Sequence, residues 1–540
     1  MSKVVGDHLL CEADVLVFQH VYQGVTYVVA ARVDDATLVD YRQLTGANAT
    51  TVIINAFAAL TGARTWKEKV TVKGNYTDLS RIIVPSNSTW EIQGKIQAIA
   101  NLNQHFVYSN NTSNVEIFGG EIDANGANQT GDMDAIYFGG VTEGIIHHVR
   151  FGNAYRSTSN GEGVEFENCE GCVVSDCFCF TGNANGYDYI KVRGTSFNCL
   201  VADNVCRDTV QGLSDAIQVS GSAHDNIIIG NIIYAKQYGQ GIKVHGSSSP
   251  YAHDNLIIGN HIYPKVAPLN YGIDILQTTN RNIVVGNHIY LASRGVEVRR
   301  VNASGDESYD NAFINNYIYL PSSGTNYGVD LDYNSLRTRV TGNIVIALPG
   351  GTNTGIRIQS GATGTHLEGG NDLSDVDIAT KISDAGTGTI YPTLVLPFVD
   401  GTLFLSADGA PWGWEIDADT EYAITHGHLP LKVQQVVKWK IWAVALVAEA
   451  DRMRLEIVGR GGGDNEVYTT ESVDIANKAS TSSNFAANDV IYWTLTASDD
   501  PDIDDFVGGD AIMIKVKHEA AGDGDCATDA AFLCVEIEYV

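Results

Sequence analysis

Basic residues are scarce in this chain. Lys and Arg number 34 against 64 Asp and Glu, which leaves a formal net charge of −30 over 540 residues. A surface of that sign repels the phosphates of nucleic acids and anionic lipid headgroups. We therefore expect no nucleic-acid partner, and the charge favours a target that is neutral, cationic or bridged by metal ions.

Long apolar runs are also missing. No stretch approaches the roughly 20 apolar residues that a membrane-spanning helix needs, so we expect no membrane insertion. The first residues, Met-Ser-Lys-Val-Val-Gly-Asp-His, lack the apolar core of a signal peptide. A protein with such a start that acts outside cells is expected to leave by another route, for example in a virus particle released by lysis.

Cysteine is too unevenly placed for a disulfide framework. Six of the nine cysteines fall between Cys169 and Cys206. Their spacing resembles a metal-binding pattern, but Cys172 and Cys199 lie 54 and 27 residues before Asn226, at a position that recurs along the chain. We therefore predict small buried packing residues, and neither a zinc site nor another cofactor.

What the chain does contain is typical of a folded protein rich in β-strands and turns. Apolar residues make up 44% of it, charged residues only 18%, and glycine occurs 55 times. A disordered chain would be more polar and more charged. At 540 residues the chain is also too long for one ordinary domain, unless that domain is an array of repeats.

Two patterns recur between about residues 134 and 360. The first is a short strand of the form Gly-Ile-x-Val, whose anchor residues follow one another at steps of 23 to 33. The anchors are Ile136, Val164, Ile190, Ile217, Ile242, Ile273, Val296, Val329 and Ile356. The second is Asn-x-Ile-Ile-x-Gly-Asn-x-Ile-Tyr, whose second asparagine recurs at steps of 27 or 29. These asparagines are Asn204, Asn231, Asn260, Asn287, Asn316 and Asn343.

Such repeats predict a solenoid. Each repeat holds two or three short strands and cannot bury its apolar face alone, so stacking is required to form one continuous core. Asparagine tolerates left-handed backbone and can hydrogen-bond to its equivalent in the next repeat. The repeat lengths of leucine-rich and hexapeptide solenoids do not fit these steps, so we do not predict either of those folds. The fold class we predict is all-β, a right-handed parallel β-helix.

The region before the repeats supports this fold. Residues 51–60 have apolar residues at helical spacing, and strands are expected within residues 69–76 and 81–94. A helix here would cap the open end of the solenoid. This succession resembles the start of the pectate-lyase-like superfamily, and the resemblance covers residues 45–390. It implies a right-handed parallel β-helix with an N-terminal capping helix.

After Asp375 the repeats fade, and residues 386–401 are interpreted as a linker. Alternating strands follow at residues 437–447, 490–496, 511–517 and 532–539, which is typical of a β-sandwich. The ending is similar to C-terminal modules of tail-fibre and tailspike proteins of tailed viruses. That resemblance implies a homotrimer held by residues 391–540, with residues 1–44 attached to other tail proteins of the virion.

Candidate chemistry lies two residues before each anchor. This column consists of Asp134, Glu162, Asp188, Asp215, Gln240, Tyr271, Arg294, Tyr327 and Thr354. Equivalent residues should project to one face, with adjacent turns about 4.8 Å apart. Four successive acids would then form an acidic stripe, which suits the paired carboxyl groups of glycoside hydrolysis. Backbone preference at turns, a cation site and chance are the alternatives.

Polygalacturonases carry N-T-D-G, G-D-D, G-H-G and R-I-K motifs on neighbouring turns, and this chain resembles them in register. Asp188 and Asp215 match two of the family's acids. However, Gln240 stands in place of the histidine, and Asp274 with Leu276 in place of the arginine and lysine that bind uronate. The resemblance therefore implies a glycan other than polygalacturonate.

Together these features favour a viral tailspike or tail-fibre protein that recognises a host surface glycan and acts outside the host cell. In this hypothesis Asp188 and Asp215 are acid and base, supported by Glu162 and Asp134. The residues expected to bind substrate are Gln240, Lys243, Tyr187 and Tyr189. A polysaccharide lyase, a free microbial polysaccharide-degrading enzyme and a non-catalytic adhesive spike remain as alternatives.

Overall fold

A computed structural model of the chain describes residues 13–390 except for short segments, together with the backbone of strands beyond residue 390. The segments left out before residue 390 are 35–36, 157–160, 181–187, 208–214, 236–239, 247–250, 265–267, 300–306, 333 and 369. The chain divides into two units, one with most residues up to Gly388 and one with residues 389–540 and two short earlier segments.

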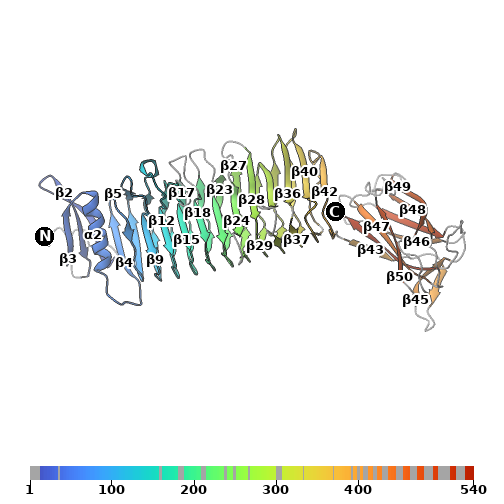
Figure 1. The fold of residues 1–540 in the computed structure, drawn as a ribbon, viewed down its shortest axis with the longest axis horizontal. Coiled ribbons are helices and arrows are strands. Elements are labelled where there is room, and N and C mark those ends of the chain that lie inside the picture. Colours follow the sequence, from blue (N-terminus) through green and yellow to red (C-terminus); the bar gives the residue numbers. More distant parts are fainter. Residues whose placement is uncertain are drawn as a thin grey trace. The chain divides into compact units, whose positions relative to one another are not determined.

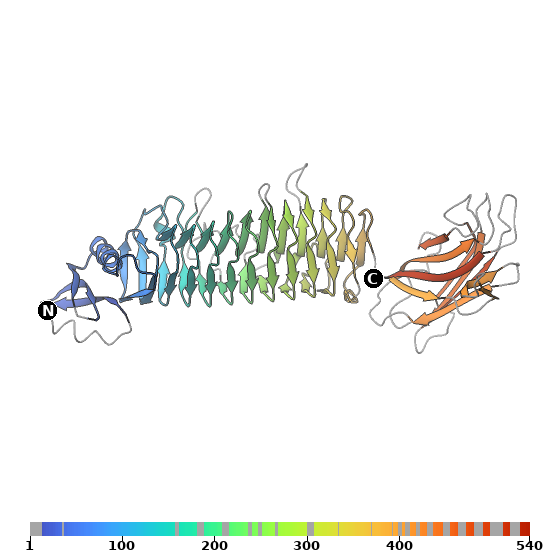
Figure 2. The same cartoon turned by 90° about the horizontal axis from the view of Figure 1, so that it is seen from below.

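The first unit is a right-handed parallel β-helix in which each turn adds one short strand to each of three long sheets (Figures 1 and 2). Sheet A has 15 strands. In spatial order they are β3 (Leu38–Gln43), β2 (Val25–Arg32), β1 (Val15–Tyr22), β4 (Glu68–Lys73), β7 (Ser88–Gln93), β10 (Val115–Phe118), β13 (Ile145–His147), β16 (Val173–Ser175), β19 (Leu200–Ala202), β22 (Ile227–Ile229), β26 (Leu256–Ile258), β30 (Ile283–Val285), β34 (Ala312–Ile314), β38 (Arg339–Thr341) and β41 (His366–Leu367).

Sheet B has 11 strands. They are β5 (Tyr76–Leu79), β8 (Lys95–Ala98), β11 (Glu121–Asp123), β14 (Arg150–Gly152), β17 (Phe178–Phe180), β20 (Val205–Arg207), β23 (Ile232–Ala235), β27 (His261–Pro264), β31 (His288–Tyr290), β35 (Tyr317–Leu320) and β39 (Ile344–Ala347). A small four-stranded sheet forms one corner of the later turns. Its strands are β25 (Ala252–His253), β29 (Thr279–Asn280), β33 (Ser308–Tyr309) and β37 (Ser335–Leu336).

Sheet C, which carries the candidate site, has 12 strands. They are β6 (Ile82–Ile83), β9 (Val107–Asn110), β12 (Ile136–Gly139), β15 (Val164–Glu167), β18 (Ile190–Arg193), β21 (Ile217–Gly221), β24 (Gln240–Gly246), β28 (Leu269–Leu276), β32 (Ala292–Arg299), β36 (Thr325–Leu331), β40 (Thr352–Ile358) and β42 (Thr380–Asp384). The predicted anchors are its core. Ile217 pairs with Ile242, and Ile242 with Ile273, and all three are fully buried.

The asparagine ladder is also confirmed. The side-chain amide of Asn231 donates to Oδ1 of Asn260 at 2.9 Å, and that of Asn260 donates to Oδ1 of Asn287 at 3.0 Å. A second ladder runs from Asn226 through Asn255. Because the ladder asparagines are buried, their amides also satisfy backbone carbonyls at the turns, which would otherwise lack partners.

Helix α2 (Gly46–Ala58) lies at the N-terminal end of the solenoid (Figure 1), as predicted for a cap. It begins earlier than the apolar spacing indicated, because the hydroxyl of Thr45 accepts a hydrogen bond from the amide of Asn48 and so starts the helix. Phe57 packs edge-on against the ring of Trp90 inside the solenoid. A short 3-10 helix (Gly126–Asn128) follows β11.

Strands β1, β2 and β3 precede the cap and extend sheet A. β1 pairs in parallel with β4 and antiparallel with β2. These strands fall within residues 1–44, for which attachment to a virion was predicted. That role, like the division of the chain at residues 44 and 390, stays a prediction.

The clustered cysteines are small core residues, as expected. The six cysteines from Cys169 to Cys206 are buried and form no disulfide. Cys199 takes the place of an asparagine in one ladder, where its amide donates to Asn226, and Cys177 does the same beside Asn204. The thiols of Cys179 and Cys206 lie 3.6 Å apart on adjacent turns.

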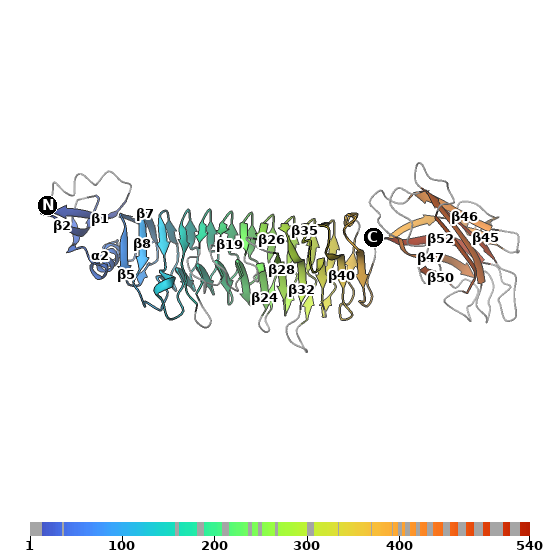
Figure 3. The same ribbon diagram turned by 90° about the horizontal axis from the view of Figure 1, so that it is seen from above.

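The second unit contains two antiparallel sheets, which agrees with the predicted β-sandwich (Figure 3). One sheet consists of β43 (Thr393–Pro397), β44 (Thr402–Leu405), β45 (Pro411–Ile416), β47 (Val436–Ala445), β50 (Val490–Thr496) and β52 (Ala530–Tyr539). The other consists of β46 (Tyr422–His428), β48 (Arg454–Gly462), β49 (Glu471–Ala479) and β51 (Ala511–His518).

The four strands expected there are confirmed as β47, β50, β51 and β52. The linker interpretation of residues 386–401 was wrong for β43, which pairs with β52 as a regular strand. Its apolar run Leu-Val-Leu pairs with β52, a partner more than 100 residues away that local patterning does not reveal. In the part of the chain that the structure describes, no helix has both the length and the apolar character needed to cross a membrane.

Candidate functional site

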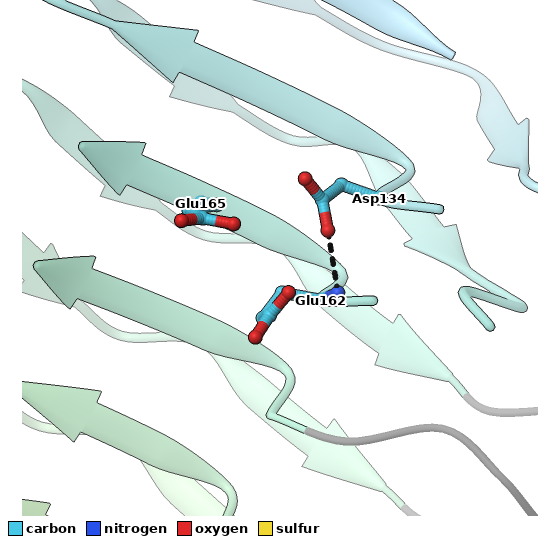
Figure 4. A group of neighbouring side chains, drawn as sticks. All are labelled: Asp134, Glu162 and Glu165. Atoms are coloured by element: carbon cyan, nitrogen blue, oxygen red, sulfur yellow. Dashed lines mark hydrogen bonds between the residues drawn. The ribbon is translucent and has the colours of Figure 1, made fainter. Parts of the chain in front are cut away.

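The predicted column of acids is aligned on sheet C. The backbone amide of Glu162 donates to Oδ1 of Asp134 at 2.8 Å (Figure 4), and the amide of Asp215 donates to Oδ1 of Asp188 at 3.2 Å. Further along, Gln240 pairs with Tyr271 in the strand register. The acids of successive turns therefore lie directly beside one another, as the spacing indicated.

At Gln240 a glycine separates the column from its anchor Ile242. Strict alternation would turn Gln240 to the same side as the core residue Ile242. Gly241 between them is skipped in the pairing, and a Cβ on it would lie 2.6 Å from the carbonyl oxygen of Gly272. A side chain therefore does not fit at Gly241, although Tyr189 and Ala216 occupy the equivalent positions beside Asp188 and Asp215.

The upstream acids form a buried group with a residue that sequence reasoning missed. Asp134, Glu162 and Glu165 each have an oxygen within 4.8 Å of the others, and all three side chains are fully buried (Figure 4). Glu165 lies in β15, one residue after its anchor. Its carboxyl group nevertheless reaches those of Asp134 and Glu162, which period-two alternation does not predict.

Two cations compensate this group. Nζ of Lys191 lies 2.8 Å from Oε1 of Glu162, and Arg193 forms an ion pair with Glu165. Carboxylate oxygens suit a hard divalent cation. Lys191 and Arg193 already neutralise two of the three carboxylates, so the group is largely self-compensated, and the expectation of no metal and no cofactor stays a prediction.

The three acids differ in their affinity for protons. Burial, with the charge of Glu162, raises the pKa of Asp134 well above its usual value. Burial and the charges of Asp134 and Glu162 raise the pKa of Glu165 to about 9. Burial acts in the same direction on Glu162, but Lys191 and the amide of Gly161 outweigh it and lower the pKa of Glu162. Asp134 and Glu165 therefore favour their protonated forms, whereas Glu162 favours its ionised form.

His105 extends the column by one turn. Its Nδ1 lies 2.5 Å from Oδ2 of Asp134, and its ring stacks on Tyr137 with centroids 4.0 Å apart. Asp134 therefore holds an imidazole and does not face solvent itself. His105 was missed because β9 lacks the Gly-Ile-x-Val pattern, although Val107 pairs with the anchor Ile136 and places His105 two residues before it.

Asp188 and Asp215 form the most open part of the predicted stripe. The carboxylate of Asp215 makes an ion pair with Lys243 at 3.2 Å and accepts a hydrogen bond from Gln218. Burial, together with the charges of Asp215 and Glu162, raises the pKa of Asp188 to about 8. Asp188 is 3% exposed, and the side chain of Asp215 is 13% exposed. Two adjacent carboxyl groups thus lie in unlike surroundings, because Asp188 is buried and tends to keep its proton whereas Asp215 is ion-paired with Lys243.

The residues expected to bind substrate are placed unevenly. Lys243 lies at the acid pair, and Gln240 occupies the next turn of the same column. Tyr189 follows Asp188 but is 5% exposed, so little of its ring is open to a ligand. Tyr187 lies outside the described residues. The binding roles of all four stay predictions.

Comparison with known proteins supports the solenoid. Residues 86–287 and 194–351 match the family described as periplasmic copper-binding protein (NosD). The A-module of mannuronan C-5 epimerase AlgE4 from Azotobacter vinelandii aligns with a TM-score of 0.50 at 17% identity, over 63% of this chain and 94% of that chain. The tailspike protein of E. coli bacteriophage HK620, in complex with a pentasaccharide, aligns with a TM-score of 0.42 at 10% identity, over 96% of this chain and 100% of that chain.

The likeness is one of fold. No curated protein matches the chain in sequence. The epimerase A-module shares the solenoid fold, in agreement with the fold that the repeats predict. The pectate-lyase-like superfamily and the viral tail type stay proposals.

Proposed function

We propose that this protein binds a host surface polysaccharide along the outer face of sheet C and hydrolyses it at Asp188 and Asp215. The observation that carries the proposal is the pair of adjacent carboxyl groups in unlike environments. Asp188 is buried and has a pKa of about 8, whereas Asp215 is ion-paired with Lys243. Glycoside hydrolysis needs one carboxylic acid and one carboxylate flanking the scissile bond.

In this mechanism Asp188 is the general acid. It holds its proton near neutral pH and donates it to the oxygen of the leaving sugar. Asp215, which is ion-paired with Lys243, attacks the anomeric carbon or activates a water. Glu162 and Asp134 are fully buried, so their part is to set the charge around the pair. Gln240, Lys243, Tyr187 and Tyr189 would contact sugar hydroxyls.

Beyond the site, we propose a homotrimeric tailspike of a virion, acting outside the host cell. This rests on the resemblance of residues 509–539 to the C-terminal modules of viral tail-fibre and tailspike proteins. Residues 391–540 would hold the trimer, and residues 1–44 would contact other tail proteins. The neighbouring epimerase is named for its action on mannuronan, which is consistent with a polysaccharide ligand for this fold.

A non-catalytic adhesive spike is the second candidate, and one observation favours it. Asp188 is 3% exposed, so a sugar oxygen reaches its carboxyl group only if the surrounding side chains shift. In an adhesin the same acids would stabilise the sheet and orient Lys191 and Lys243. A free microbial polysaccharide-degrading enzyme is the remaining alternative.

The test is incubation with purified envelope polysaccharides of candidate hosts, followed by mass analysis of released oligosaccharides. We expect Asp188→Asn and Asp215→Asn each to lower the release of reducing ends by about 100-fold or more, because each removes one proton-transfer or nucleophilic group. Both variants keep the side-chain volume, and binding of the same polysaccharide should persist.

The matched control is Asp225→Asn. Asp225 has a positive φ of 53° that asparagine tolerates, and its side chain is 52% exposed outside sheet C. This variant should retain full activity. Unchanged release by Asp188→Asn and Asp215→Asn would eliminate the site, and binding of a polysaccharide without any release by the wild type would favour the adhesin.

A further inference from the structure

Sheet C carries a second layer of charge downstream of the acid pair. Three arginines gather on β32 and β40, which are separated by one strand of the sheet, β36 (Figure 3). They are Arg294, Arg299 and Arg357, with side chains 31%, 26% and 23% exposed. On a chain with a formal net charge of −30, three clustered guanidinium groups are an exception.

Buried acids hold these arginines from beneath. Arg299 donates to Asp274 at 2.7 Å, and Arg357 contacts Asp330 through both Nε and a terminal nitrogen. Both acids are fully buried. The carboxylates face the sheet and the guanidinium groups lie above them, so the outer layer is cationic. A buried acid that fixes a guanidinium in one orientation pre-organises it for an external anion.

Two tyrosines complete the surface. The guanidinium of Arg357 lies 3.6 Å from the ring centroid of Tyr327, and that of Arg299 lies 4.5 Å from the centroid of Tyr271. Arg294 lies over both rings, at 5.3 and 5.7 Å. Stacking restricts the long arginine side chains further, and the half-buried rings offer apolar area beside the charges.

The charges do not cancel within this surface. Glu297 lies between Arg294 and Arg299, and burial with the charges of Asp274 and Asp330 raises its pKa to about 9. It is therefore protonated near neutral pH. Three guanidinium groups then face two other carboxyl groups, which leaves an excess of positive charge.

We propose that this arginine–tyrosine surface is a subsite for an anionic group of the bound glycan, a carboxylate, sulfate or phosphate ester. Bidentate hydrogen bonds from arginine to such groups are short and charge-assisted. The surface begins two strands beyond β21 and ends five strands beyond it, which corresponds to about 10 to 24 Å along the sheet. A glycan several sugars long, lying along the solenoid, would span both this surface and Asp215.

The inference deepens the proposed function, since it names the chemistry of the glycan, but it rests on binding and not on cleavage. The probes are size-matched hexasaccharides. Oligogalacturonate, oligosialate, a sulfated chondroitin and a phosphodiester-linked oligomer present the three anionic groups. Carboxyl-reduced oligogalacturonate and maltohexaose are neutral. Titration calorimetry on the full chain measures each affinity.

We expect at least one anionic probe to bind about tenfold or more tightly than either neutral probe, with an affinity that falls as salt is added. Arg294→Gln should weaken this binding by about tenfold, because it removes one charge-assisted contact. Arg294→Lys, which keeps the charge and loses the planar fork, should restore only part of it.

The matched control is Arg337→Gln. Arg337 is 56% exposed and paired with Asp310, away from sheet C, so its loss lowers the net charge equally without touching the surface. It should leave affinity unchanged to within about twofold. Thermal unfolding of each variant verifies that it is folded. If Arg337→Gln weakens binding as much as Arg294→Gln, or if no anionic probe is preferred, the inference is wrong.

The same samples separate the two proposals. Asp215→Asn should bind the preferred anionic probe as the wild type does. Anion binding that depends on Arg294, without cleavage of any polysaccharide, would uphold the subsite and refute the hydrolase. Cleavage of a neutral polysaccharide at an unchanged rate in Arg294→Gln would refute the subsite and uphold the hydrolase.

Discussion

The protonation of single carboxyl groups decides what the stripe on sheet C can do. Asp188 and Asp215 are the same residue type in the same column, one turn apart. Asp188 lies in a buried position beside two other acids, whereas Asp215 faces Lys243. Burial and neighbouring negative charge raise the pKa of a carboxyl group, and both act on Asp188. The two positions are thereby suited to different roles, acid and base.

The pH dependence of cleavage follows from this difference. The general acid must be protonated to act. The enzyme is therefore active at pH values below the pKa of this acid and loses activity as the pH rises above it. Because the pKa of Asp188 is about 8, we expect kcat to fall about tenfold per pH unit above that value. Initial rates between pH 5 and 10, with about unit steps, measure it. A plateau up to pH 10, well above the pKa of about 8, would show that Asp188 is not the acid.

At the scale of elements, side-chain ladders make each turn of the solenoid fit the next. The amide of Asn260 donates to Oδ1 of Asn287 and to two backbone carbonyls, and its own Oδ1 accepts from Asn231. Stacked aromatic rings form a similar ladder on sheet B, where the ring centroids of Tyr263 and Tyr290 lie 4.6 Å apart. Each ladder stabilises one register between neighbouring turns, because a shifted turn would leave buried amides without hydrogen-bond partners.

Asn260→Ala tests the ladder. The substitution removes an amide that several buried groups depend on, and we expect the free energy of unfolding to fall by about 3 kcal/mol. Denaturant titration of the solenoid unit measures the loss. The control is Asn128→Ala, at an exposed asparagine of the 3-10 helix, which should change stability by about 0.5 kcal/mol or less. An equal effect of the two variants would mean that the ladder contributes little to stability.

At the scale of the whole molecule, the solenoid and the antiparallel unit have different roles in the proposal. A solenoid grows by adding turns and offers long faces, whereas an antiparallel unit is a closed domain. The long face suits a polymer ligand. Residues 391–540 contain the two antiparallel sheets, to which the resemblance to viral tail modules assigns trimerisation.

The trimer predicts a native mass of about 174 kDa, three times the chain mass of 58.1 kDa. Native mass spectrometry or light scattering of the full chain measures it. A chain ending at residue 390 should behave as a monomer if residues 391–540 hold the trimer together. A full-length chain of monomeric mass would contradict the trimer and leave the glycan site of a single chain unaffected.

The sequence by itself determined the solenoid and its register. A β-helix is close to one-dimensional, so residues about 27 apart become neighbours and spacing alone predicts contacts such as Asn231 with Asn260. The same spacing predicted that Asp215 lies next to Asp188, one turn away. It failed where a repeat lacked the pattern, as at His105, and where pairing was distant, as at β43.

Only the tertiary structure decided which acids are reachable and which are paired. Glu165 reaches Asp134 and Glu162, and Lys243 reaches Asp215, although alternation along a strand places these two columns on opposite faces. Burial and charge then set the protonation of each acid through distances between side chains on neighbouring turns. Such distances depend on how turns stack in three dimensions, so the roles of Asp134 and Asp188 follow from the fold and not from their place in the repeat.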